Sequence, residues 1–78
     1  MITILRLPKV LQMTGLSESC FYEHVKLGLM TKSVLITKRS VGWPSYEIEE
    51  INKARISGKT DTEIQILVNN LHEKRKEV

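Results

Sequence analysis

The feature that most constrains the fold is a very short break between two amphipathic segments near the N-terminus. Gly15 can end a helix in the left-handed conformation, and Ser17, two positions later, is a favoured N-cap residue for the next helix. Pro8 suits the first turn of the earlier helix, because no helical hydrogen bond needs its missing N–H there. The sequence therefore predicts two helices joined by a turn of about three residues, a helix-turn-helix.

The second helix is predicted over residues 18–27, with Ser17 as its N-cap and Gly28 ending it. Phe21 and Val25 are four positions apart, so they share the buried stripe. The opposite face is then exposed, and it consists of Ser19, Tyr22, Glu23 and Lys26, with Cys20 on its flank as a half-buried filler.

Residues 34–43 change to the alternation that is typical of strands. The alternating apolar residues are Val34, Ile36, Val41 and Trp43. Lys38 and Arg39 lie between the two runs, so we expect a hairpin whose tip, residues 37–40, carries two cations. Neither residue favours the positive φ of the tightest turns, which predicts a looser or distorted loop. Helix-turn-helix and hairpin together predict a mostly helical fold with a small β-hairpin, a winged helix-turn-helix.

Two more helices are expected after the hairpin. Pro44-Ser45 begins the first, whose inner face consists of Ile48, Ile51 and the stem of Arg55, and whose early acidic residues, Glu47, Glu49 and Glu50, suit a helix N-terminus. Thr60 and Glu63 form a capping box that begins the last helix. Its apolar stripe consists of Ile64, Leu67, Val68 and Leu71.

The last helix leaves two alternatives open. Its stripe either completes the core of one chain or pairs with a second copy to form a homodimer. Residues 72–78 are polar until the last position, so we expect them to fray. We accordingly divide the chain into a winged helix-turn-helix domain, residues 1–56, and a C-terminal helix, residues 57–78, that completes the core or dimerises.

Composition argues against several other classes of protein. Cys20 is the single cysteine, and His24 and His72 are 48 positions apart, so no zinc motif is present and we expect no metal or other cofactor. No apolar run approaches the roughly 20 residues of a membrane span, and no segment resembles a signal peptide. No nucleophile has a neighbouring base. We expect a cytoplasmic, nucleoid-associated protein that is not an enzyme and has no small-molecule substrate.

The charge is unevenly distributed along the chain. Residues 1–43 carry six basic and two acidic side chains, a net charge of +4, whereas residues 44–78 carry a net charge of −1. The helix-turn-helix and the hairpin are therefore the better candidates for contact with a polyanion.

Residues 6–51, RLPKVLQMTGLSESCFYEHVKLGLMTKSVLITKRSVGWPSYEIEEI, resemble the AlpA-type phage regulators, relatives of the excisionases within the MerR-like winged-helix group. The resemblance lies in Leu7-Pro8, Thr14-Gly15-Leu16-Ser17, Tyr22, Gly28 and Arg39-Ser40-Val41-Gly42-Trp43-Pro44. It implies a DNA-binding transcription factor of a prophage or integrated element. Glu18 and Glu23 depart from the pattern, since basic residues are common there, and Cys20 replaces a small hydroxyl residue.

Together these observations predict a sequence-specific DNA-binding regulator. Residues 18–27 would enter the major groove of double-stranded DNA, and the tip, residues 37–40, would lie on the backbone or in the minor groove. The expected contact residues are Ser17, Ser19, Cys20, Tyr22, Glu23, Lys26, Lys38 and Arg39. Two alternatives use the same scaffold: an excisionase-like factor that bends DNA for an integrase, and an adaptor that binds another protein.

Overall fold

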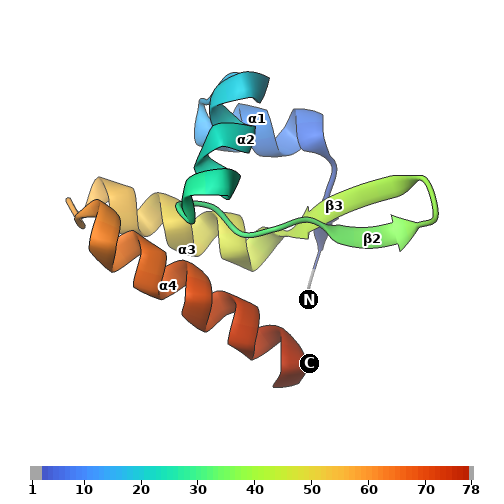
Figure 1. Cartoon of the computed structure of the whole chain (residues 1–78). Helices are drawn as coiled ribbons and strands as arrows, with labels where there is room; N and C mark the ends of the chain where they lie inside the picture. The colour runs from blue at the N-terminus through green and yellow to red at the C-terminus, as the bar shows by residue number, and fades with distance from the viewer. Residues whose placement is uncertain (1–2, 78) are drawn as a thin grey trace.

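The computed structural model describes residues 3–77 and confirms the winged helix-turn-helix fold, mostly helical with a small antiparallel sheet. Helices α1 and α2 lie on one side of α3, α4 lies on the other, and the β2–β3 hairpin projects away from the helices (Figure 1). The elements are β1 (Ile4–Leu5), α1 (Leu7–Thr14), α2 (Glu18–Leu27), β2 (Val34–Thr37), β3 (Ser40–Pro44), α3 (Ser45–Ile56), α4 (Asp61–Lys74) and a final 3₁₀ helix η1 (Arg75–Glu77).

The turn between α1 and α2 has the predicted chemistry. Gly15 has a φ of 75° and donates its N–H to the carbonyl of Leu11, which closes α1. Ser17 is the N-cap of α2, and its Oγ accepts the N–H of Cys20 at 3.3 Å. Gly28, with a φ of 80°, ends α2. Local backbone chemistry therefore places both ends of α2 where the sequence predicts them.

The sheet contains one strand that the sequence did not predict. Its order is β1-β3-β2, all antiparallel, and β1 pairs with the residues at the end of β3. The hairpin, which we call the wing (residues 34–44), has a register shift between Leu35 and Thr37. Arg39 donates its N–H to Thr37 Oγ1 at the tip, and no non-glycine residue within 3–77 has a positive φ. The tip is a two-residue turn rather than a looser loop, since Thr37 pairs with Ser40, and the expected distortion lies in β2, at the register shift.

The core joins the recognition elements to the rest of the chain. Phe21 of α2 and Trp43 of β3 are almost fully buried and pack edge to face, with ring centroids 5.0 Å apart. Val25 packs against the core as a half-buried residue. The other fully buried side chains include Val10, Met30, Ile48, Ile51, Ile64, Val68 and Leu71.

Helix α4 completes the core of its own chain. Its capping box forms as predicted, with Thr60 and Glu63 exchanging hydrogen bonds. Ile64, Val68 and Leu71 are at most 2% exposed, and Leu67 is half-buried. This burial supports the alternative in which the stripe completes the core of one chain, and homodimerisation stays a prediction.

Two expectations about the C-terminal half are corrected. Residues 72–77 are helical: α4 continues to Lys74, η1 follows, and Arg75 forms a bidentate ion pair with Glu47 at 2.7 Å. Val78, the last residue of the tail that was expected to fray, lies outside the described residues. Glu47 lies in the first turn of α3, as predicted, and is fully buried. The stem of Arg55 does not line the core, since Arg55 is exposed and contacts His24.

Candidate nucleic-acid interface

The outward face of α2 is uncovered by the rest of the chain. Ser19, Glu23 and Lys26 are exposed, and Tyr22 is 46% exposed while its ring packs against Phe21 edge to face. Cys20 is also exposed, so its expected role as a half-buried filler is wrong. Phe21, which follows Cys20 and lies about 100° further round the helix, is buried, and this fixes the rotation of α2 about its axis.

The N-terminal end of α2 presents hydroxyl groups. Ser17 Oγ and Ser19 Oγ are 3.5 Å apart and exposed, and Ser17 also caps the helix. The first turn of a helix concentrates unpaired N–H groups and the positive end of the helix dipole, which favours an anion such as phosphate. Glu18 lies in the same turn and is exposed. This end therefore combines groups that attract a phosphate with one carboxylate that repels it.

The cations of the candidate interface are free of ion pairs. Within residues 3–77 the ion-paired cations are Lys53, Lys59, Arg75 and Lys76, and Lys26, Lys38 and Arg39 are not among them. Lys38 and Arg39 are exposed at the tip of the wing. A phosphate can therefore bind these three cations without breaking an internal ion pair.

Side chains from three other elements hold α2 in place. Arg55 of α3 makes a 3.1 Å hydrogen bond to His24 Nδ1, and Gln65 of α4 donates to the carbonyl of Leu27 at the end of α2. Trp43 of β3 donates its Nε1–H to the carbonyl of Thr31, in the link that follows α2. The sequence did not predict these partners, because nothing in the local pattern indicates them.

Comparison with protein-family models identifies one family. The model described as Prophage CP4-57 regulatory protein (AlpA) matches residues 3–56, more than half of the chain. The chain belongs to the AlpA family. The resemblance that the sequence motifs indicated is confirmed, and the protein is a phage-type regulator. Comparisons with curated proteins and with solved structures found no match.

The family match ends at the last residue of α3. Helix α4 and η1 of this AlpA protein follow the matched segment, yet they supply three of the fully buried side chains of its core. The matched segment contains the whole of the candidate interface.

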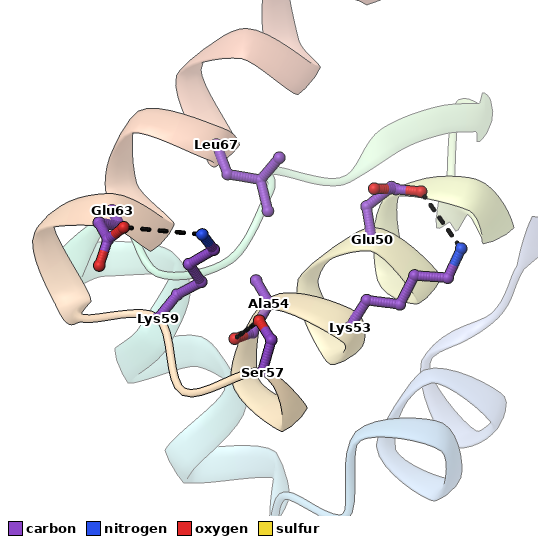
Figure 2. Close-up of a pocket in the computed structure, with 7 residues that line it drawn as sticks. All are labelled: Glu50, Lys53, Ala54, Ser57, Lys59, Glu63 and Leu67. Carbon is purple, nitrogen blue, oxygen red and sulfur yellow. Dashed lines mark hydrogen bonds and ion pairs between the residues drawn. The ribbon is translucent and has the colours of Figure 1, made fainter.

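A groove lies between α3 and α4 of this AlpA protein. It has a volume of about 390 Å³, and Ala54 and Leu67 lie toward its middle (Figure 2). Its rim carries two ion pairs, Glu50–Lys53 and Lys59–Glu63. Ser57 Oγ donates to the carbonyl of Ala54, so that hydroxyl is already engaged. The groove is therefore a gap along the packing contact between two helices, and its polar groups are already paired.

Residues 3–77 hold neither a metal-binding cluster nor a membrane-spanning helix. No cluster of three or more His, Cys, Asp or Glu side chains is arranged to hold a metal ion there. No helix in this part of the chain has the length and hydrophobicity that crossing a membrane requires.

Proposed function

We propose that this AlpA-family protein binds double-stranded DNA sequence-specifically and regulates transcription from a promoter of a prophage or integrated element. Helix α2 enters the major groove, and the wing tip, residues 37–40, lies on the backbone or in the minor groove. The supporting observation is that the exposed face of α2 and the unpaired tip cations belong to elements packed together through Phe21 and Trp43. Residues 1–56 act as the DNA-binding unit, and residues 57–78 support it.

Each exposed residue has a chemical role in this proposal. The Ser17, Ser19 and Tyr22 hydroxyls contact phosphate oxygens near the N-terminal half of α2. Lys26 binds a phosphate or a guanine, and Glu23 accepts a hydrogen bond from a cytosine amino group. Cys20 lies at the edge of the same face. At the wing tip, Lys38 and Arg39 add backbone contacts that fix the register of α2 in the groove.

The experiment that tests the proposal is in-vitro selection of DNA fragments by the purified protein, followed by affinity measurements over a range of salt concentrations. We expect one enriched sequence, and affinity that falls steeply with salt because bound counterions are released. Lys26→Ala and Arg39→Ala should each make the slope of log K against log[salt] shallower by about 0.9, the value for one phosphate contact. Lys53→Ala, which removes a cation that Glu50 pairs on α3, is the matched control. Failure to retain DNA at low salt overturns the proposal.

The form of the selected site reports how many copies bind. Inverted repeats would indicate a dimer. A circular-permutation gel shift on the selected fragment distinguishes a regulator from an excisionase-like factor, since only the latter needs to bend DNA strongly.

A protein-binding adaptor is a second candidate function, and two carboxylates favour it. Glu18 and Glu23 are exposed on α2 and belong to none of the ion pairs found within residues 3–77. They would suit a basic partner surface and repel phosphate. The Glu18→Lys variant separates the two functions: an adaptor loses affinity for its partner, whereas a DNA-binding protein keeps or increases its affinity for DNA. Adding Glu23→Lys should weaken the adaptor further, and in the DNA-binding protein it should change the preference for cytosine at one position.

A further inference from the structure

The link between α2 and the wing, residues 28–33, has no regular secondary structure, yet side chains from elsewhere hold its main chain. Lys32 donates its N–H to His72 Nε2 at 3.1 Å, and its carbonyl accepts from Arg75 Nη2 at 2.6 Å. Gln65 donates to the carbonyl of Leu27, at the start of the link. All three partners come from α4 and η1, and we call Gln65, His72 and Arg75 the C-terminal clamp.

Arg75 is the centre of the clamp because one guanidinium serves two elements. Its Nε and Nη2 each donate to a carboxylate oxygen of Glu47 in α3, at 2.7 Å, while Nη2 also reaches Lys32. Glu47 is fully buried, so its charge depends on this guanidinium for compensation. The planar fork of arginine suits this bidentate arrangement, which lysine cannot reproduce.

The clamp contacts the chain at the base of the wing, far from the wing tip. Strand β1 pairs only with Trp43 and Pro44, so beyond them the wing is a two-stranded ribbon. With about 3.3 Å of rise per residue, the tip lies up to about 20 Å from Lys32, and a rotation of 10° at the base would move it by roughly 3 Å. Such a displacement is large compared with the tolerance of a hydrogen bond to phosphate.

The base of the wing is held on both sides. On the β3 side, β1 pairs with Trp43, whose ring packs on Phe21 in the core. On the β2 side, Leu29, Met30 and Thr31 of the link are buried, and the exposed Lys32 that follows them is held by its hydrogen bonds to the clamp. The clamp therefore restrains the exposed part of the link, between the buried Thr31 and the start of β2.

We propose that the C-terminal clamp fixes the orientation of the wing relative to α2, with Arg75 as the positioning residue, so that α2 and the wing tip reach one DNA site together. The DNA-binding part of this inference rests on the proposed function. Arg75 is assigned no contact with DNA in this proposal. It acts through Lys32, whose position determines where Lys38 and Arg39 lie.

The test uses a double variant of the whole chain, Glu47→Met/Arg75→Met. It removes the ion pair without leaving a buried carboxylate uncompensated, and replacement of a buried pair by apolar side chains of similar size is often tolerated. The matched control is Glu73→Met/Lys76→Met, which removes an exposed ion pair of the same segment at the same change in net charge. Should the first variant fail to fold by circular dichroism, Glu47→Gln/Arg75→Gln takes its place, because glutamine is too short to span both partners of Arg75.

Orientation is measured without DNA, by residual dipolar couplings of the amide groups of α2 and of the wing. In the wild type and in the control, both sets should fit one alignment tensor. In Glu47→Met/Arg75→Met, the couplings of the wing should no longer fit the tensor of α2. Couplings that are unchanged in this variant overturn the clamp, whatever the protein does with DNA.

DNA binding provides the second readout, on the selected fragment. Loss of both tip contacts should make the salt slope shallower by up to about 1.8, which corresponds to roughly a sixty-fold loss of affinity at about 0.1 M salt. In a Lys38→Ala/Arg39→Ala background the same substitutions should cost nothing further, because the tip contacts are already absent. An equal loss in that background overturns the positioning role. If the wild type binds no DNA, the proposed function fails, and the couplings alone decide the clamp.

Discussion

Substitution of Gly42 by alanine should destabilise the protein by about 2 kcal/mol, because a side chain there has no room. A Cβ atom at this position would lie 2.6 Å from Ile4 Cγ2, 2.8 Å from the carbonyl oxygen of Leu5 and 2.9 Å from Ile36 Cδ1. The two isoleucine methyl groups can rotate away. The Leu5 oxygen can move only with its strand, since Leu5 is paired with Trp43, so β1 must shift away from β3.

Thermal unfolding followed by far-UV circular dichroism measures the effect. Overpacking of this kind costs about 1–3 kcal/mol, and each kcal/mol lowers the Tm of a domain of this size by about 4–8 °C. We therefore expect Gly42→Ala to unfold about 8–16 °C below the wild type. Adding Ile4→Ala and Ile36→Val removes two of the three close contacts and should restore only part of the loss, because the Leu5 oxygen remains.

Gly58→Ala is the matched control. Gly58 has a φ of 83° and no heavy atom within 4 Å of a Cβ atom placed there, so alanine meets only backbone strain, about 1 kcal/mol. The close approach of β1 to Gly42 would be refuted if Gly42→Ala unfolded within about 2 °C of the wild type.

Two further predictions concern the link and the helix that holds it. Thr31 Oγ1 is buried and has no hydrogen-bond partner, so Thr31→Val should raise the free energy of unfolding by about 1 kcal/mol; a lower Tm in a thermal melt would mean that the hydroxyl is satisfied. Burial, followed by the charge of Arg75, lowers the pKa of His72 from 6.5, while Glu47 opposes the shift. The unfolded chain therefore takes up the proton first, and stability should be constant above pH 6.5 and fall as the pH decreases toward the folded pKa. Urea titrations from about pH 7 to about pH 5.5 should show this fall in the wild type and not in His72→Gln, which retains an acceptor for Lys32.

The helix-turn-helix could be predicted because its determinants are local. Gly15, Ser17 and Gly28 act within one turn of the helix that each of them ends or begins, and the spacing of Phe21 and Val25 selects the buried face of α2. The same spacing indicated which side chains would be exposed. These features depend on contacts no more than four residues apart, so the order of residues alone contains them.

The features that the sequence did not indicate all depend on contacts between distant residues. Strand β1 is only two residues long and exists because β3 offers it an edge. Cys20 was expected to be half-buried, and its exposure follows from how α2 is rotated against Trp43. No periodicity distinguishes a half-buried flank from an exposed one at such a position.

The last helix separates most clearly what the sequence determined from what the tertiary structure determined. The sequence determined that residues 61–74 form a capped helix with an apolar stripe, because capping and periodicity are properties of adjacent turns. Only the tertiary structure decided that this stripe faces its own chain, and that Arg75 crosses 28 positions to Glu47 and 43 to the carbonyl of Lys32. A buried carboxylate and a guanidinium with two partners can be recognised only when the surfaces that exclude water from them are in place, and those surfaces come from the whole fold.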